Sequence, residues 1–295
     1  MATVAFIGLG NMGGPMAANL VKAGHTVRGF DLSVAALDAA RTAGASVAGT
    51  PSEAAAGADV VITMLPSGKH LLDVYGSGVL GAAATGALFI DCSTCDVESA
   101  RKAHALASDA GMLSLDAPVS GGVGGATAAT LTFMVGGSAD AFERGRPVLE
   151  AMGKRVIHCG DAGNGQAAKI CNNMILGISM IGVCEAFALA EKLGLSTQSL
   201  YDVASTSSGQ CWSITSYCPV PGPVPASPAN NGYKPGFAAA LMLKDLRLAQ
   251  AAAQQVAAAT PLGAHAAQIY ALFDAAGHGG DDFSGVINFL KGQAG

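Results

Sequence analysis

The chain has few charged residues, few aromatic residues and no run of lysine or arginine. Charged residues make up 13% of its 295 residues and aromatic residues 5%, whereas hydrophobic residues make up 51%. A chain of this composition can bury a sizeable core, which argues against intrinsic disorder. The formal net charge of -5, with no basic stretch, argues against a nucleic-acid partner.

Cysteine and histidine are present, but not in the patterns of a disulfide framework or a metal centre. The seven cysteines are an odd number at irregular spacing. Cys92 and Cys95 form a CxxC pair, but no second pair follows and the six histidines form no ligand cluster. We therefore expect no metal, and we interpret the cysteines as buried thiols in a reducing compartment.

The patterns of a secretory leader and of a membrane span are also missing. A glycine motif begins at Gly8, where the charged and apolar parts of a leader would have to lie. We therefore see no signal or transit peptide and expect a cytoplasmic protein. The most apolar long stretch, residues 174–190, contains Glu185 and falls short of a clean span of about 20 residues. We interpret it as a buried helix and expect no membrane partner.

Short β-rich runs alternate with helical runs over the first half of the chain. Apolar runs of strand length, typical of buried parallel strands, occupy residues 3–8, 26–31, 58–65, 87–91 and 113–117. Helical spacing lies between them, as at residues 15–23 and 97–110. This alternation predicts an α/β domain with a Rossmann-type, doubly wound sheet over residues 1–162.

The pattern changes near residue 163. Residues 165–193 are typical of one long helix without an internal proline. Further helical segments occupy residues 197–205, 237–258, 261–275 and 283–290. We therefore expect residues 163–295 to form an all-α domain that begins with a long interdomain helix. Residues 218–235 are rich in proline and are predicted to form an extended, stiff loop, either a passive connection or a functional segment.

The pattern Gly8-x-Gly10-x-x-Gly13 follows the first strand and opens the first helix, the context in which it binds a dinucleotide. Gly8 allows the tight turn, Gly10 lets the backbone approach a pyrophosphate, and Gly13 lets helix and strand pack closely. The helix N-terminus offers unpaired N–H groups to the phosphates. The residues expected to contact the cofactor here are Gly8, Leu9, Gly10, Asn11, Met12 and Gly13.

Asp31 ends the second strand, close to the distance of about 20 residues at which an acidic residue bonds the ribose hydroxyls. Its carboxylate would repel a 2′-phosphate and no arginine follows it, so the sequence favours NAD over NADP. Two later strand ends, Leu65-Pro66 and Thr94, should face the same cofactor, because ligands bind beyond the carboxyl ends of parallel strands. Ordinary loops remain the alternative at both places.

A serine and two glycines follow the strand predicted at residues 113–117. Ser120-Gly121-Gly122 exposes backbone N–H groups and a hydroxyl, a nest that suits a carboxylate. A flexible loop is the alternative interpretation of the same residues.

Two lysines are candidates for the reacting site. Lys169 and Asn173 are four residues apart, on one face of the long helix among apolar neighbours. Lys244-Asp245 lies in another apolar stretch, with a surface ion pair as the alternative. Oxidation of an alcohol with NAD as hydride acceptor needs a base for the hydroxyl proton. A lysine base needs its pKa lowered from about 10.4 to roughly 7–8, which burial and a second ammonium both favour.

These ordered motifs together resemble the β-hydroxyacid dehydrogenase family over almost the whole chain. The segments that carry the resemblance are residues 6–13 (FIGLGNMG), 116–122 (DAPVSGG), 163–173 (GNGQAAKICNN) and Lys244-Asp245. The resemblance implies NAD as cofactor and a homodimer or homotetramer. It implies that Lys169 is the catalytic residue, that Lys244 lies near the nicotinamide and that Asp245 orients a lysine. The residues implied to hold the substrate carboxylate are Ser120, Gly121, Gly122 and Asn173.

Within the family, residues 207–212 and 217–222 resemble the members that oxidise (S)-3-hydroxyisobutyrate to methylmalonate semialdehyde in valine breakdown. Related tartronate semialdehyde and glyoxylate reductases lack this proline-rich segment. Trp212 is expected near the substrate or at a subunit contact, and Cys218 stands where an asparagine is expected. A family member that acts on serine or tartronate semialdehyde, or an NAD-binding sensor without activity, are the alternatives.

Overall fold

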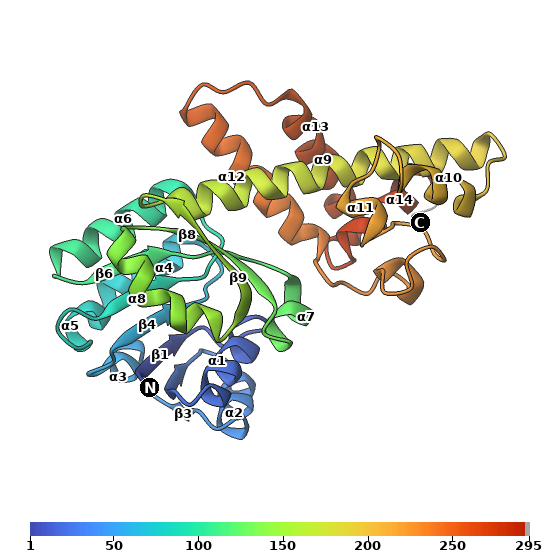
Figure 1. Cartoon of the computed structure of the whole chain (residues 1–295). Helices are drawn as coiled ribbons and strands as arrows, with labels where there is room; N and C mark the ends of the chain where they lie inside the picture. Colours follow the sequence, from blue (N-terminus) through green and yellow to red (C-terminus); the bar gives the residue numbers. More distant parts are fainter. Residues whose placement is uncertain (293–295) are drawn as a thin grey trace. The chain divides into compact units, whose positions relative to one another are not determined.

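The computed structural model describes residues 1–292, and the chain divides into two compact units, Met1–Lys169 and Ile170–Gly295 (Figure 1). The last residues of the expected second domain, 293–295, lie outside the described residues. The division expected between residues 162 and 163 falls earlier than this one. The difference arises because the start of the long helix lies in the first unit, where Gly165 packs closely on β6 and β8.

One sheet forms the frame of the first unit. In the described part of the chain it has nine strands in the order β3-β2-β1-β4-β5-β6-β8-β7, with β9 paired to β8. The strands are β1 (Thr3–Ile7), β2 (Thr26–Phe30), β3 (Ser46–Val47), β4 (Val60–Thr63), β5 (Leu88–Asp91), β6 (Leu113–Asp116), β7 (Val119–Ser120), β8 (Leu131–Gly136) and β9 (Gly153–Gly160). β1 to β6 pair in parallel, which confirms the doubly wound arrangement predicted from the sequence.

The last three strands are an addition that the sequence pattern did not reveal. β8 runs antiparallel to both β6 and β7, and β9 runs parallel to β8. β7 has only two residues, and β9 is largely exposed, with Lys154 and Arg155 on it. Neither strand therefore carries the apolar run by which a buried strand is identified, and charged residues of this kind protect a sheet edge from pairing with other chains.

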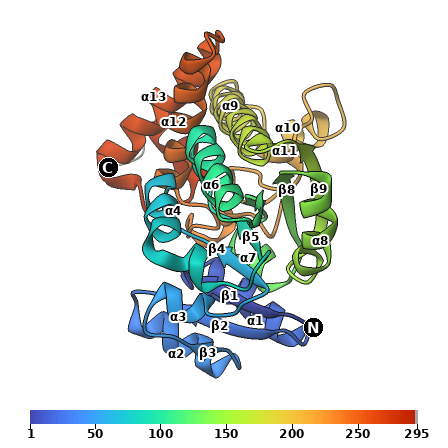
Figure 2. The ribbon, with the colours of Figure 1, turned by 90° about the vertical axis from the view of Figure 1, so that its left-hand side faces the viewer.

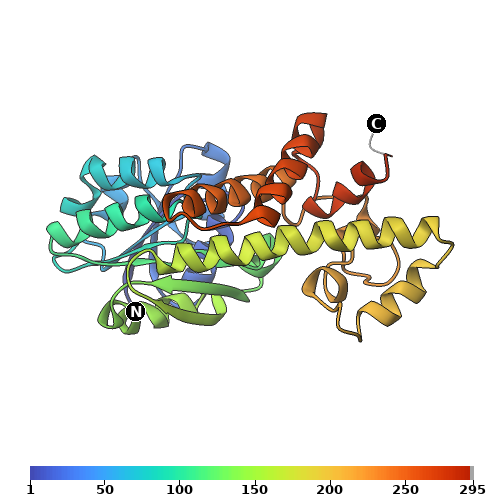
Figure 3. The same ribbon diagram turned by 90° about the horizontal axis from the view of Figure 1, so that it is seen from above.

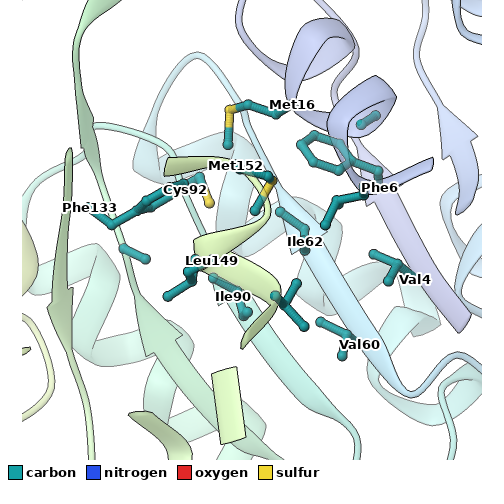
Figure 4. Close-up of a cluster of buried hydrophobic side chains, with 14 of the residues drawn as sticks. Val4, Phe6, Met16, Val60, Ile62, Ile90, Cys92, Phe133, Leu149 and Met152 are labelled. Carbon is teal, nitrogen blue, oxygen red and sulfur yellow. The ribbon is translucent and has the colours of Figure 1, made fainter. Parts of the chain in front are cut away.

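Helices cover both faces of the sheet (Figure 2). One face carries α1 (Gly13–Lys22), α2 (Val34–Thr42), α7 (Gly122–Thr127) and α8 (Ala139–Glu150). The other carries α3 (Pro51–Ala55), α4 (Gly68–Val74), η1 (Tyr75–Val79), α5 (Leu80–Ala82) and α6 (Val97–Asp109). Successive strand residues point to opposite faces: Phe6 of β1 lies in the first core with Ile62 of β4 (Figure 4), and Ala5 lies in the second.

The second unit is helical, as predicted. Its elements are α9 (Asn164–Lys192, which starts in the first unit), α10 (Thr197–Ala204), α11 (Trp212–Thr215), η2 (Pro228–Asn231), α12 (Ala239–Gln255), α13 (Pro261–Phe273), η3 (Asp274–His278), η4 (Phe283–Gly285) and α14 (Val286–Leu290). Figure 3 shows α9 as one continuous helix. Phe187 of α9, Met242 of α12 and Tyr270 of α13 meet in one buried core.

By length and composition alone α9 could cross a membrane, since it is long and apolar. Its apolar residues Met180, Cys184 and Phe187 are instead buried in the helical core. We therefore interpret α9 as the core helix that its sequence pattern indicated.

The proline-rich loop is less extended than predicted. It contains the 3-10 turn η2, and side chains tie the loop to itself. Ser227 Oγ donates to the carbonyl of Cys218 at 2.6 Å, and Tyr233 Oη donates to the carbonyl of Pro219 at 2.8 Å. These bonds make the loop a closed, fixed segment without regular helix or strand.

We expect two glycines of α9 to respond in opposite ways to alanine. A Cβ at Gly165 would overlap the carbonyl oxygens of Asp116 and Met134, so Gly165→Ala should lower the free energy of unfolding by roughly 1–3 kcal/mol. A Cβ at Gly182 would meet nothing within 4 Å, so Gly182→Ala should raise it by up to about 1 kcal/mol. Urea unfolding measures both, and equal changes would contradict the close approach at Gly165.

Candidate active site

The glycine loop between β1 and α1 has the geometry of a dinucleotide cradle. A Cβ at Gly8, which has φ of +96°, would overlap the carbonyl oxygen of Met64, and a Cβ at Gly13 would overlap that of Gly8. These two glycines are therefore required by the protein itself. A Cβ at Gly10 would meet nothing within 4 Å, so the protein packing does not require glycine there. The open space at Gly10 fits the close approach of a pyrophosphate to the backbone.

The start of α1 suits an anion. Among the described residues no side chain caps this helix, and its first turn holds no acidic residue. Asn11 is exposed and Met12 is half-buried, so the loop faces outward, whereas Leu9 is buried in the core beneath it. The first N–H groups of the helix can therefore bind phosphate oxygens.

Asp31 joins the glycine loop to the end of β2. Its Oδ2 accepts from Leu9 N at 2.6 Å and its Oδ1 accepts from Ser33 N at 2.7 Å. Arg28 of β2 points elsewhere, since its Nη2 donates to the carbonyl of Ala56 at 2.5 Å, and Leu32 beside Asp31 is exposed. A carboxylate without a neighbouring arginine fits the two free ribose hydroxyls of NAD. The residues present thus fit the cofactor that the sequence predicted.

The two later strand ends lie against each other. β4 is followed by Leu65 and Pro66, and β5 by residues 92–94. Leu65 N donates to Ser93 Oγ at 2.8 Å, so the loop of Leu65 is bonded to the loop of Thr94. The structure therefore brings these two predicted cofactor segments together at the carboxyl edge of the sheet.

Beneath these loops lies a buried carboxyl group, Asp91, which sequence reasoning treated only as a strand end. Its Oδ1 accepts from Thr63 Oγ1 at 2.7 Å and from Ser93 Oγ at 2.6 Å. Burial raises the pKa of Asp91 from 3.8 to about 6, because the hydrogen bonds from Ser93 and Thr63 offset the loss of solvation only in part. The available signal in the sequence was an aspartate at the end of a buried strand with a serine two residues later.

The CxxC pair lies in the same region and is deeply buried. Cys92 and Cys95 have exposed fractions of 0% and 1%, and burial raises the pKa of the Cys92 thiol well above its ordinary value. None of the seven cysteines, all within the described part of the chain, forms a disulfide.

The segment Ser120-Gly121-Gly122 forms the turn between β7 and α7. Gly121 and Gly122 have φ of +134° and +61°, and Ser120 pairs with Thr132 of β8. The turn is anchored behind by Asn19 of α1, whose side chain donates to the carbonyl of Ala126 at 2.7 Å in a buried bond. The two glycines therefore shape a turn whose backbone can bind an anion.

Asp116, at the end of β6, holds the start of α9. Its Oδ1 accepts from Gly163 N and its Oδ2 from Gln166 N, both at 2.9 Å. His104 Nε2 of α6 lies 2.9 Å from Oδ1 of Asp116, and His104 Nδ1 lies 2.6 Å from Ser114 Oγ. A carboxylate at this place bonds otherwise unpaired amides and interacts favourably with the helix dipole. In the sequence, Asp116 was recognised only as the first residue of the motif at 116–122, and no role was predicted for it.

Lys169 and Asn173 lie on the same face of α9 and are almost fully buried, with exposed fractions of 6% and 2%. Asn173 Nδ2 donates to Asp245 Oδ2 of α12 at 2.5 Å. Asp245 is itself buried and its neighbour Lys244 is half-buried, so this pair is not a surface ion pair. The role expected of Asp245 in orienting a lysine stays a prediction.

Trp212 begins α11 and is 49% exposed. Its ring stacks on Tyr217 at 4.7 Å between centroids, and Tyr217 stacks on Phe283 at 5.3 Å. Tyr217 Oη donates at 2.8 Å to Asp282, a fully buried carboxylate that also accepts from Gly236 N at 2.9 Å. The sequence analysis included Tyr217 only within a segment that carries the resemblance, and it missed Asp282. Tyr217 stacks on the exposed tryptophan, and Asp282 accepts the hydrogen bond of Tyr217.

Two family models together match nearly the whole chain. The model described as the NAD-binding domain of 6-phosphogluconate dehydrogenase matches residues 3–160. The model described as NAD-binding of NADP-dependent 3-hydroxyisobutyrate dehydrogenase matches residues 163–290.

Three similar proteins agree with these models. The solved structure of 3-hydroxyisobutyrate dehydrogenase from Mycobacterium tuberculosis with L-serine has a TM-score of 0.95 and 59% identity, covering 99% of both chains. The 3-hydroxyisobutyrate dehydrogenase of Pseudomonas aeruginosa is 51% identical over 99% of this chain and 100% of its own. An NAD-dependent L-serine dehydrogenase of the same species is 49% identical over 97% of each.

The chain belongs to the β-hydroxyacid dehydrogenase family. Its fold, NAD as its cofactor and its class as an oxidoreductase, each predicted from the sequence, are thereby confirmed. The roles of individual site residues in this β-hydroxyacid dehydrogenase stay predictions.

The raised pKa of Asp91 predicts a stability that depends on pH. The folded protein binds this proton more tightly than the unfolded chain, so the stability contribution is complete below about pH 4 and is lost as the pH rises through about 6. The shift corresponds to roughly 3 kcal/mol. Asp91→Asn keeps an acceptor for Thr63 and Ser93 but cannot ionise. The unfolding free energy of the native protein, minus that of Asp91→Asn, should fall between pH 4 and 7, and a constant difference would contradict this.

Proposed function

We propose that the chain oxidises (S)-3-hydroxyisobutyrate to methylmalonate semialdehyde with NAD, as in valine breakdown. The observation that carries the chemistry is the burial of Lys169, whose exposed fraction is 6%. Lys169 follows the first turn of α9, which Asp116 at the end of β6 bonds through Gln166 N. The substrate is supported by full-length relatives named 3-hydroxyisobutyrate dehydrogenase at 51–58% identity.

In this proposal Lys169 takes the proton of the substrate hydroxyl. A neutral amine can accept this proton, and burial in general disfavours the charged form of a lysine. NAD, when bound, supplies the acceptor for the hydride that leaves the carbinol carbon. The O–H bond breaks, its proton goes to Lys169 and its electron pair forms the second carbon–oxygen bond. The C–H bond breaks and its electron pair leaves with the hydride, so the alcohol becomes an aldehyde.

The remaining site residues would bind rather than react. Ser120, with the N–H groups of Gly121 and Gly122, would hold the carboxylate through the nest formed by the two positive φ angles. The amide of Asn173, one turn beyond Lys169, is a further carboxylate ligand in this proposal, and its Nδ2 donates to Asp245. Lys244 is proposed to lie near the nicotinamide.

L-Serine is a second candidate substrate. One relative at 49% identity is named NAD-dependent L-serine dehydrogenase, and the similar solved structure is described with L-serine. Serine shares the carboxylate and the primary alcohol with 3-hydroxyisobutyrate, but carries an ammonium where the latter carries a methyl group. An ammonium must keep polar partners when it leaves water, whereas a methyl group favours an apolar wall. The protein side chains that face this methyl or ammonium group therefore decide which of the two substrates is preferred.

We also propose a homodimer or homotetramer in the cytoplasm. Ile175 and Leu189 are exposed large hydrophobic residues of α9, and a second copy could bury them. Sedimentation of a monomer at micromolar concentration would contradict the assembly.

Seven cysteines without disulfides suit the reducing cytoplasm, which cell fractionation would test.

The purified protein should form NADH with 3-hydroxyisobutyrate at a higher kcat/KM than with L-serine. The measurement is absorbance at the NADH band with each substrate, using NAD and NADP in parallel. NAD should be preferred because Asp31 repels a 2′-phosphate. A higher kcat/KM for serine would favour the second candidate, and no turnover of any small 3-hydroxy acid would contradict both.

Replacing Lys169 by alanine should lower kcat by about 10²–10⁴-fold, the usual contribution of a general base. NAD should still bind, because the glycine loop and Asp31 are unchanged, and calorimetry measures that affinity. Lys192→Ala, in the last turn of the same helix, is the matched control and should keep the wild-type kcat. Near-normal turnover in Lys169→Ala would remove the lysine from the reaction.

A further inference from the structure

Gln166 is a fully buried polar residue to which the proposed reaction gives no task. Its exposed fraction is 0%, and it lies within the motif at residues 163–173, which assigns it no role. Its Nε2 donates to the carbonyl of Ser93 at 2.7 Å, and its Oε1 accepts from Cys95 N at 3.1 Å. The amide therefore bonds the backbone on both sides of Thr94, the residue predicted to contact the cofactor ribose. Fully buried glutamine is uncommon, and here both ends of the amide have a partner.

The same residue is held from a second direction. Gln166 N donates to Asp116 Oδ2, and Gly163 N donates to Asp116 Oδ1, so the carboxylate at the end of β6 bonds the first turn of α9. His104 Nε2 lies on the far side of that carboxylate at 2.9 Å. We call Asp116 and Gln166 together the Asp116–Gln166 clamp, because they join the turn to β6 and to the loop after β5.

The packing leaves this turn little freedom to move. A Cβ at Gly165 would overlap the carbonyl oxygens of Asp116 and Met134, and a Cβ at Gly136 would overlap the carboxylate of Asp116. On the other side, the hydroxyl of Ser93 bonds both Asp91 and Leu65 N. The clamp therefore connects rigid strand ends to the helix, rather than one mobile loop to another.

Lys169 lies three residues beyond Gln166 in the same helix, so it follows the turn as a rigid body, about 4.5 Å along the axis. We propose that Asp116 and Gln166 are positioning residues that fix the Lys169 amine relative to the Thr94 loop. The inference rests on the proposed function, in which a proton and a hydride leave one carbinol group at the same time. The acceptors of both must then hold a fixed mutual position, and a displacement of about 1 Å can cost on the order of 100-fold in rate.

Gln166→Met tests this directly, since methionine keeps the length of the side chain but cannot bond Ser93 or Cys95. Positioning predicts that kcat falls at least tenfold while KM for the substrate changes less than threefold. It also predicts a larger primary isotope effect with 3-hydroxyisobutyrate or L-serine deuterated at C3, because a misaligned hydride transfer becomes rate-limiting. An unchanged kcat and isotope effect would overturn the proposal.

Two further variants separate positioning from stability. Thr50→Ala removes the hydroxyl that caps α3 by accepting from Glu53 N at 3.1 Å, a bond of the first unit outside the clamp. It should destabilise the protein but leave kcat and the isotope effect unchanged. Asp116→Asn weakens the clamp from the other side and should show the same fall in kcat and the same larger isotope effect. It therefore tests the proposal on its own if Gln166→Met fails to fold. The same signature in Thr50→Ala would assign it to lost stability and overturn the proposal.

Hydrogen exchange supplies a readout that needs no turnover. In Gln166→Met the amides of residues 93–95 and of residues 163–169 should exchange faster together, by more than the other buried amides of the first unit. In Thr50→Ala any acceleration should instead be shared by all buried amides of the unit, because it reflects lost stability alone. If only one segment responds, the two are not joined by the clamp and the proposal fails. If the wild-type protein turns over no 3-hydroxy acid, the proposed function fails, but this coupling still decides whether the clamp exists.

Discussion

The bonds between the carboxylate of Asp116 and the first amides of α9 are the interaction on which the site depends. They connect β6, the last strand of the parallel series β1 to β6, to the helix that carries Lys169 and Asn173. Without them the first turn of a 29-residue helix would present unpaired N–H groups in a buried place. Because a helix is stiff over one or two turns, holding this turn also limits the freedom of Lys169, three residues beyond Gln166.

Steric exclusion makes that connection close. Glycine at positions 136 and 165 leaves room for the Asp116 carboxylate and for the helix backbone, and any Cβ there would occupy the same space. The glycine loop of β1 uses the same device, since Gly8 and Gly13 remove overlaps within the protein. Gly10 differs, because its missing side chain leaves space that the protein does not use. The contrast separates glycines that the packing of the protein requires from one that it does not require.

The candidate site combines backbone anion binding with a buried polar network. The start of α1 and the Ser120–Gly122 turn offer N–H groups. Beneath the loops predicted to bind the cofactor, Ser93 donates to Asp91 through its hydroxyl and accepts from Gln166 at its carbonyl. Buried polar groups of this kind are tolerated because each has a partner, and such networks specify one arrangement of the chain. In the second unit Asp282 does the same for the Trp212–Tyr217 stack.

The sequence by itself determined the alternating α/β domain, the helical second domain, the glycine loop, Asp31 and the lysine on the long helix. Each of these is a local pattern: an apolar period, a glycine spacing or a residue pair one helical turn apart. The tertiary structure decided that β8 runs antiparallel to β6 and that Gln166 reaches Cys95, 71 residues away in the chain. It also decided that Asp116 bonds the start of α9 and that Asp91 is buried. Such contacts join residues distant in sequence, and neither propensity nor periodicity carries information about which distant groups the packed strands bring within bonding distance.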